Sequence, residues 1–491
     1  MSMRNKNRLL TLSIVAALTC ATISAQDRAA RNTRPTAFTN ARIHTVSGEA
    51  IENGTIVIKN GKIEAIGNDI VVPAGAKIID ATDMTIMPGL VSAWSRAGLR
   101  APSRSSNTPQ RGRRSGRRMP SMGRGSSSAS NKAATKVFDG IYIRQPIFRS
   151  LLETGVTSLA LNPDGRGFPG LGAVLNPAGK TRDELALDDE AFVQIGMQRS
   201  GAAKQLLKAT FEKAKKVVEE RTKPAAPAEP AKKPEAPAPG KKPAEAKPTP
   251  KPAEGKEPPK PTPTPKPTPK PTPKPEPKPK PKEGEKKQPA KPPAAAKAPP
   301  KKPVDPNVEV IADLLQGKRR AILQIDSAAD LLHWQSVVAD DVKFPRMVAV
   351  QRHDTTAGTI DLVIDHLKKW ECSVLLPPVL TTMPQTQYLI HPAKKLHDAG
   401  IEIGFALGDD PRTVRDIFFN MMELVRAGLP AETAIKAITL VPAKALGIDK
   451  RTGTLEIGKD ADLLIFNGDP LSPTGTLEQI WLRGNRVEKK N

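Results

Sequence analysis

The sequence predicts an α/β protein, with a barrel of alternating strands and helices and a small β-domain contributed by both ends of the chain. Two observations carry this prediction. β-Rich segments lie near both termini, and apolar runs alternate with amphipathic helices between them. Two low-complexity segments interrupt that alternation. The length of 491 residues suggests two or three domains.

The β-rich segments are residues 36–85 and 451–491. In the first, "TIVIKNGKIEAIG" alternates apolar and polar residues on both sides of Asn60-Gly61. Asn-Gly between two such runs is a strong hairpin signal, because both residues tolerate positive φ. The second contains the short runs "GTLEIGKDADLLIF" and "QIWLRGNRVEKK". We expect the two segments to pair into one small sheet domain; two separate hairpins packed on the body are the alternative.

Residues 86–450 alternate between strand-like and helix-like segments. The apolar runs are "VTSLALN", "RAILQID", "RMVAVQR", "CSVLLPP" and "IEIGFALG". Helical periodicity follows at 202–221, 413–427 and 431–446. This alternation favours a parallel sheet. Without the longer low-complexity segment, about 280 residues remain, which suits a (β/α)8 barrel of the TIM type. A doubly wound open sheet is the alternative.

The two low-complexity segments are residues 101–134 and 223–303. The longer one holds 29 of the 50 prolines and 21 lysines against 8 glutamates, and the shorter one is rich in Arg, Ser and Gly. Together they account for most of the formal charge of +25, so the remainder is close to neutral. The proline-rich composition cannot bury a core, and we expect an extended, disordered insertion within the barrel.

These basic segments are candidate contacts for a polyanion or the cell envelope, with a solvated spacer as the alternative. Aromatic residues do not interleave with the basic ones, so no base-stacking platform and no specific nucleic-acid motif is predicted.

Residues 1–25 have the pattern of a secretory signal peptide. Arg4, Lys6 and Arg8 precede an apolar run at 9–21, and Ser24-Ala25 supplies small residues for cleavage. The run is short for a membrane span. An uncleaved anchor and a lipoprotein are the alternatives. We expect export to the periplasm, the cell surface or the medium of a bacterium.

Three motifs resemble the amidohydrolase superfamily, especially its exported imidazolonepropionase-like members. They are "ATDMTIMPGLVSAWSRAGL", "IEIGFALGDDP" and "AGLPAETAIKAITLVPAKALGIDKRTGTLEIGKDADLLIFNGDP". The segment "LLETGVTSLALNPDG" also fits. The resemblance covers residues 36–221 and 306–490. It implies a (β/α)8 barrel with a small β-sandwich formed by both termini.

The resemblance also implies hydrolysis of non-peptide C–N bonds of small molecules by metal-activated water at the barrel mouth. The family's strand-one motif supplies Asp-x-His-x-His. Here Ser92 takes the Asp position, and Trp94 and Arg96 take the two His positions. An indole N–H and a guanidinium cannot ligate a cation. The next family histidine aligns best with Gln324, and Gln351 or His353 takes the one after it.

Asp410 aligns with the catalytic Asp of strand eight, beside Asp409. A retained structural carboxylate is the alternative. Because a buried carboxylate needs a partner, we expect Arg96 to replace the metal's charge by pairing with Asp410. Trp94 is interpreted as a plug of the former metal cavity. We expect no cofactor, and zinc only where His353 and Asp410 rebuild a site.

The remaining histidines and glycines are interpreted as structural. His391 and His397 are expected to be solvated or to cap a helix, and three others are expected in strand or helix contexts: His44, His333 and His366. The glycines of "GRGFPGLGAVLNPAGK" lack the context of a phosphate loop, and the resemblance implies a loop over the mouth there.

Three functions therefore remain open: a ligand- or partner-binding protein without catalysis, a C–N hydrolase with a rebuilt metal site, and an interaction protein acting through its basic segments. The identity of a small-molecule ligand and the oligomeric state are not predicted.

Overall fold

The computed structural model describes residues 34–99, 129–197, 200–222, 304–338, 342–350 and 357–488. All described residues belong to one compact unit. The predicted signal peptide, the proline-rich insertion of 223–303 and most of the 101–134 segment lie outside the described residues.

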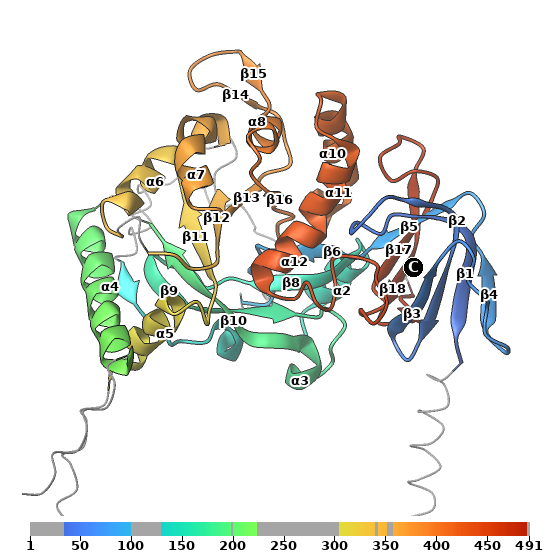
Figure 1. The fold of residues 1–491 in the computed structure, drawn as a ribbon, viewed down its shortest axis with the longest axis horizontal. Helices are drawn as coiled ribbons and strands as arrows, with labels where there is room; N and C mark the ends of the chain where they lie inside the picture. Colours follow the sequence, from blue (N-terminus) through green and yellow to red (C-terminus); the bar gives the residue numbers. More distant parts are fainter. Residues whose placement is uncertain are drawn as a thin grey trace, which may run out of the picture. The chain divides into compact units, whose positions relative to one another are not determined.

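Both ends of the chain pair into one eight-stranded sheet, which confirms the shared terminal domain and makes the alternative of separate hairpins wrong (Figure 1). The strand order is β19-β18-β17-β5-β1-β2-β3, with β4 on β1. The junction is the antiparallel pair of β17 and β5, in which Ile465 lies opposite Ile86. The strands are β1 (Thr36–Ile43), β2 (Ile51–Lys59), β3 (Lys62–Gly67), β4 (Lys77–Asp80), β5 (Met84–Pro88), β17 (Leu463–Asn467), β18 (Thr476–Leu482) and β19 (Asn485–Arg486).

The predicted hairpin connects β2 to β3. Asn60 and Gly61 have φ angles of 51° and 77°, as a tight turn between twisted strands requires. The sheet has its own core, in which the Phe38 and Trp481 rings pack edge to face with centroids 5.1 Å apart. Apolar residues from both chain ends therefore close this domain.

The second sheet has eight strands in sequence order, β6-β8-β9-β10-β11-β12-β13-β16, with the short β7 on β9. A doubly wound sheet would reverse its order at a switch point, so this alternative is wrong. The first and last strands approach each other, since the backbone N–H of Arg96 donates to Oδ1 of Asp409 at 2.8 Å. The strands are β6 (Leu90–Ser92), β7 (Ser130–Asn131), β8 (Val156–Leu161), β9 (Gly167–Leu175), β10 (Ala186–Gly196), β11 (Ala321–Ile325), β12 (Arg346–Val350), β13 (Ser373–Leu376) and β16 (Ile403–Phe405).

All five predicted strands of the middle region are present, as β8, β11, β12, β13 and β16. The two sheets meet at Gly89, between β5 and β6, rather than at residue 85. A Cβ at Gly89 would lie 2.2 Å from Oγ1 of Thr157. Glycine therefore allows the chain to pass from one sheet to the other against β8.

The glycine-rich segment expected as a loop over the mouth instead contains the whole of β9, so this expectation is wrong. β9 runs antiparallel to both β8 and β10, whereas the other neighbouring pairs on the strand path are parallel. Every residue of β9 is buried. A Cβ at Gly172 would lie 2.1 Å from the Phe192 ring, so the glycine admits that ring. The same glycines that suggest a loop thus serve close packing.

Helices cover the barrel strands, and their described members are α2 (Pro146–Leu152), α3 (Arg182–Leu185), α4 (Gly201–Thr222), α5 (Pro306–Leu315), α6 (Ala328–Gln335), α7 (Ile364–Lys369), α8 (Pro392–Asp398), α9 (Pro411–Arg415), α10 (Ile417–Arg426), α11 (Ala431–Ile438) and α12 (Leu440–Leu446). Helix α4 confirms the prediction over 202–221. Two 3₁₀ helices, η1 (Val137–Gly140) and η2 (Ala357–Val363), and a two-stranded hairpin of β14 (Thr381–Thr382) and β15 (Leu389–Ile390) complete the described elements.

The helix predicted over 431–446 is broken into α11 and α12 at Thr439, which has φ −130° and ψ −80°. Pro442 explains the break, because its ring would clash with the carbonyl of residue 438 in a continuous helix. In the first turn of α12 its missing N–H is tolerated.

Side chains alternate between the barrel interior and the helix layer. Ile322 belongs to an interior cluster, whereas the next residue, Leu323, belongs to the larger core beneath the helices. By the two-residue period of a strand, Gln324 faces inward with Ile322. We call the interior cluster that contains Ile322 the barrel-interior cluster. Its strand members are Val91, Ala160, Val174, Ala191, Phe192, Ile322, Met347, Ala349 and Leu375.

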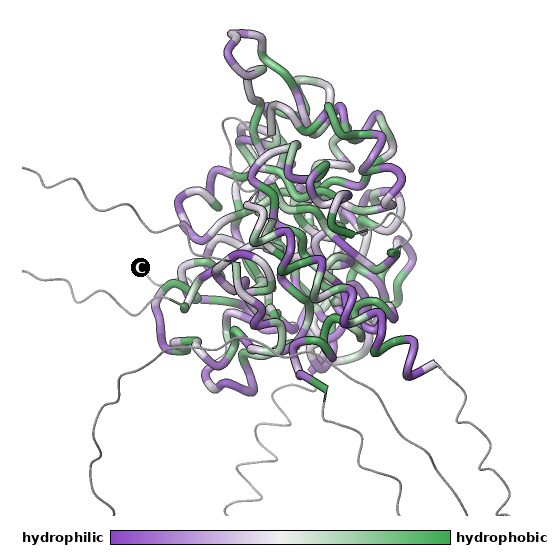
Figure 2. The backbone as a smooth tube through the Cα atoms, turned by 90° about the vertical axis from the view of Figure 1, so that its left-hand side faces the viewer, coloured by the Kyte–Doolittle hydropathy of each residue, from purple (hydrophilic) through white to green (hydrophobic). Residues whose placement is uncertain are grey.

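Hydrophobic segments concentrate in the interior of the folded part, and the turns at its periphery are mostly hydrophilic (Figure 2). Among the described helices, none combines the length and hydropathy that a bilayer crossing requires.

Candidate functional site at the barrel mouth

The strand-one segment that follows β6 brings Trp94 and Arg96 to the mouth of the barrel. Trp94 is half-buried and packs against the barrel-interior cluster. Ser95 is fully buried, and its hydroxyl accepts a hydrogen bond from the backbone N–H of Ala97 at 3.0 Å. The segment is therefore fixed by packing on one side and by hydrogen bonds on the other.

A chain of buried carboxamides extends from this segment across the barrel. The backbone N–H of Ser95 donates to Oδ1 of Asn162 at 2.9 Å. Nδ2 of Asn162 donates to Oε1 of Gln194 at 3.2 Å, and Nε2 of Gln194 donates to Oε1 of Gln324 at 3.4 Å. We call Asn162, Gln194 and Gln324 the carboxamide chain. It joins the segments after β6 and β8 to β10 and β11.

The carboxamide chain is inaccessible in this conformation. Asn162 and Gln194 are 0% exposed and Gln324 is 6% exposed. Amides are neutral and both donate and accept, so they satisfy one another in a buried site without the desolvation cost of ionised groups. The site is thus a polar interior that carries no formal charge.

Charged groups surround this neutral centre. Nη2 of Arg96 lies 2.9 Å from Oδ1 of Asp164, which is on the turn after β8. On the same turn, Arg166 forms an ion pair with Asp326, directly after β11, and its Nη1 donates to the carbonyl of Met197 at 3.4 Å. The turn from β8 to β9 is therefore tied to strand one and to the end of β11.

The predicted pairing of Arg96 with Asp410 is wrong, because the ion pair of Arg96 is with Asp164. Asp410 is exposed and caps α9, where its Oδ1 accepts from the backbone N–H of Arg412 at 3.0 Å. Asp409, which is half-buried, faces strand one instead and accepts from the N–H of Arg96. The strand-eight carboxylate at the mouth is thus the residue before the one that the resemblance indicated.

One atom at this junction has no partner. Nε of Arg96 is buried and has no hydrogen-bond acceptor. A buried guanidinium N–H without an acceptor is destabilising, by about 1–3 kcal/mol or more for a charged group. Arg96 therefore keeps an unused donor at the mouth.

The described mouth residues do not fit the divalent metal that the fold family implies. A guanidinium, an indole and hydrogen-bonded carboxamides offer poor ligands, and Oε1 of Gln324 already accepts from Gln194. Within the described ranges, no group of three or more His, Cys, Asp or Glu side chains is placed to hold an ion. Gln351 and His353, the other candidates, lie outside the described residues.

The sequence did not single out Asn162, Asp164 or Gln194. Asn162 ends the run "VTSLALN", and polar residues at the carboxyl end of a parallel strand are a usable signal in this fold. Gln194 gave no such signal, since β10 begins with the polar run "ALDDE" and was not predicted as a strand.

The prediction that His391 is either solvated or caps a helix is confirmed, because it caps α8. Its Nδ1 accepts from the backbone N–H of Lys394 at the start of α8, at 3.1 Å. Burial lowers the pKa of His391 below its ordinary value, which favours the neutral ring that can accept.

Comparisons with known proteins agree on the family. The model of the "Amidohydrolase family" matches residues 389–487. The chain is 31% identical to an imidazolonepropionase of Thermoplasma acidophilum over 128 residues, 26% of this chain and 31% of that protein. It is 22% identical to the amidohydrolase tasK of Hapsidospora irregularis over 182 residues, 31% of this chain and 18% of that protein. The matches thus span less than a third of these relatives' length.

The fold agrees over a longer range. The crystal structure of an amidohydrolase from Thermotoga maritima superimposes with a TM-score of 0.61 at 20% identity, covering 93% of this chain and 100% of that one. The family match falls on the C-terminal motif noted in the sequence, and the structural match includes both the barrel and the terminal sheet. The family match, the imidazolonepropionase relative and the shared fold together support a place for this chain in the amidohydrolase superfamily.

Proposed function

We propose that this chain is a ligand-binding member of the superfamily that does not carry out metal-dependent hydrolysis. The carboxamide chain carries this proposal. It occupies inward-facing positions of the barrel with groups that satisfy one another. Metal-activated water needs anionic or imidazole ligands with an open coordination position. Neutral amides in mutual hydrogen bonds supply neither.

Arg96 indicates the chemistry of the ligand. Its side chain is 26% exposed, and its partner Asp164 is 78% exposed. An exposed ion pair of this kind contributes about 0–1 kcal/mol, so a ligand carboxylate can replace Asp164 at little cost. The unpartnered Nε of Arg96 offers such a carboxylate a second donor, which allows the bidentate hydrogen bonding that guanidinium groups form with carboxylates. We therefore propose a small carboxylate as the ligand.

The test is a thermal-shift titration of the full chain with benzoate, and with benzamide as the uncharged counterpart. We expect benzoate to raise the melting temperature of the wild type, and benzamide to leave it unchanged. Arg96→Gln is expected to abolish the benzoate shift. Arg149→Gln, which removes another exposed arginine paired with Glu153, is the matched control and is expected to retain it. A benzoate shift of equal size in Arg96→Gln contradicts the proposed ligand site.

A C–N hydrolase with a rebuilt metal site is the second candidate. Two observations favour it: the similarity to an imidazolonepropionase and an amidohydrolase, and the position of Asp409 beside strand one. In this case zinc would be held by Asp409 or Asp410 with His353. Hydrolysis of a simple cyclic imide such as succinimide by the zinc-treated chain, lost in Asp409→Asn, would support this candidate over the first.

Two further proposals rest on the sequence alone. The pattern of residues 1–25 supports export from a bacterial cell. The excess of lysine in residues 223–303 supports contact with a polyanion or the cell envelope. Retention on heparin that falls with salt, and is lost when residues 223–303 are deleted, would support the second of these.

A further inference from the structure

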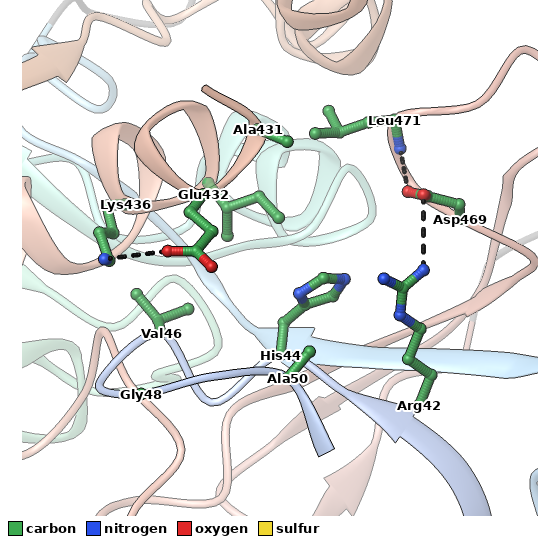
Figure 3. Close-up of a pocket in the computed structure, with 11 residues that line it drawn as sticks. Arg42, His44, Val46, Gly48, Ala50, Ala431, Glu432, Lys436, Asp469 and Leu471 are labelled. Atoms are coloured by element: carbon green, nitrogen blue, oxygen red, sulfur yellow. Dashed lines mark hydrogen bonds and ion pairs between the residues drawn. The ribbon is translucent and has the colours of Figure 1, made fainter. Parts of the chain in front are cut away.

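A second site lies where the terminal sheet meets helix α11, and it shares no residue with the barrel mouth (Figure 3). It is a cavity of about 180 Å³. Its walls come from β1, the loop after β1, the first turns of α11 and the loop after β17. The polar residues that line it are Arg42, His44, Glu432, Lys436 and Asp469.

The cavity has an apolar body and a polar rim. Val46, Ile435 and Leu471 supply the apolar walls. On the rim, Arg42 lies 2.9 Å from Glu52 and 3.7 Å from Asp469. Lys436 lies 3.5 Å from Glu432. Because each cation of the rim has an acidic neighbour, the rim offers no unbalanced charge to a charged ligand.

His44 stands inside the cavity, between Glu432 and Arg42 (Figure 3). Its Nε2 is buried and has no hydrogen-bond partner. Burial, followed by the positive charge of Arg42, lowers the pKa of His44 below its ordinary value, while Asp469, Glu52 and Glu432 oppose this shift. The ring is therefore neutral at pH 7, with one N–H donor and one acceptor nitrogen.

The loop that forms one wall is strained. Val46 has φ +69°, a left-handed conformation that a β-branched residue rarely adopts. Hydrogen bonds hold the loop in place: Gly48 N–H donates to Oγ1 of Thr45 at 3.2 Å, and Leu455 N–H donates to the carbonyl of Thr45 at 2.9 Å. Strain of this kind persists where the surroundings impose it, and it gathers at ligand sites.

We propose that this cavity binds a neutral, single-ring heterocycle that hydrogen-bonds to His44. The cavity volume limits the ligand to a single ring, since an apolar cavity of about 150 Å³ holds one benzene ring. Because the positive and negative charges of the rim are paired, we expect the ligand to be neutral. The unpartnered ring nitrogen of His44 determines the polar contact, because a buried imidazole nitrogen without a partner gains a hydrogen bond from a ligand that can donate to it or accept from it. Neither the residues nor the ligand class coincide with those proposed for the barrel mouth.

The experiment uses the full chain and 2-pyridone, which places an N–H donor and a carbonyl acceptor side by side on one uncharged ring. Binding is followed by saturation-transfer NMR and by titration of protein resonances. We expect saturable binding to the wild type and weaker binding of nicotinate, a charged ring of similar size. His44→Phe keeps the ring and removes its nitrogens, and we expect it to weaken 2-pyridone binding about tenfold.

Ala431→Trp provides an independent variant, because Ala431 is exposed at the start of α11 and its replacement fills the cavity from the rim. We expect it to abolish binding while the circular dichroism spectrum and melting temperature stay near those of the wild type. His397→Phe, on α8 and outside the cavity, is the matched control and should bind as the wild type does. Absence of 2-pyridone binding to the wild type, undiminished binding in both cavity variants, or tighter binding of nicotinate would each overturn the proposal.

Discussion

At the scale of single residues, the barrel mouth differs from the expected metal centre in the kind of side chain it buries. Gln324 was identified from the alignment, but its two carboxamide partners Asn162 and Gln194 were not. The mouth carboxylate is also Asp409 rather than Asp410, because Asp410 is the N-cap of α9. Sequence motifs located this region to within one or two residues. Side-chain direction could not be predicted, since it depends on where each strand ends and each helix begins.

A titratable residue of the terminal domain allows a prediction at the same scale. Asp462 is buried, and burial raises its pKa to about 6 from an ordinary 3.8, although its Oδ1 accepts a hydrogen bond from the N–H of Arg483. Between these two values the native state keeps a proton that the unfolded chain releases. The contribution of Asp462 to stability is therefore complete below pH 3.8 and is lost as the pH rises through about 6.

We expect the free energy of unfolding of the wild type, relative to that of Asp462→Asn, to fall by roughly 2 kcal/mol between pH 4 and pH 7. Denaturant unfolding at several pH values measures this difference. Asp69→Asn changes an exposed carboxylate and is the control, for which we expect a pH profile parallel to the wild type. A constant difference between wild type and Asp462→Asn across this range would show that Asp462 is not buried as the structure has it.

At the scale of elements, the predictions succeeded for uninterrupted apolar runs and failed where glycines or polar residues broke the pattern. β8, β11, β12, β13 and β16 were predicted because each is a short, mostly apolar run. β9 was missed because its glycines resemble those of a loop, and β10 because its first half is polar. Packing explains why both segments are nevertheless strands. β9 lies between β8 and β10, and Gly172 of β9 leaves space for the Phe192 ring of β10.

This packing predicts the effect of a single methyl group. Gly172→Ala places a Cβ 2.1 Å from Phe192 and should destabilise the chain by about 1–3 kcal/mol through overpacking. Phe192→Leu in the same chain should recover part of this loss, which a double-mutant cycle measures. Gly140→Ala, where the added Cβ meets no atom within 4 Å, is the control. Additive effects of the two substitutions would contradict the proposed contact.

At the scale of the whole molecule, the fold does not determine the chemistry of the barrel mouth. The pairing of β17 with β5 and the sequential order of the barrel strands agree with the barrel and the shared terminal domain that the C-terminal motif implied. The chemistry at the mouth does not follow from the same motif, because it depends on Trp94, Arg96 and the carboxamide chain. A conserved architecture can thus hold a centre with a different donor set, and activity has to be argued from that centre.

The central claim is that the barrel mouth does not hold a catalytic metal. The most direct test is the zinc content of the purified full chain, measured by elemental mass spectrometry after incubation with zinc and desalting. A loaded site of the family would retain about one or two ions per chain. We predict that the wild type retains far less than one zinc per chain and that Asp409→Asn does not differ from it. Stoichiometric zinc in the wild type, lost in Asp409→Asn or Asp410→Asn, would contradict the claim and favour a rebuilt hydrolase site.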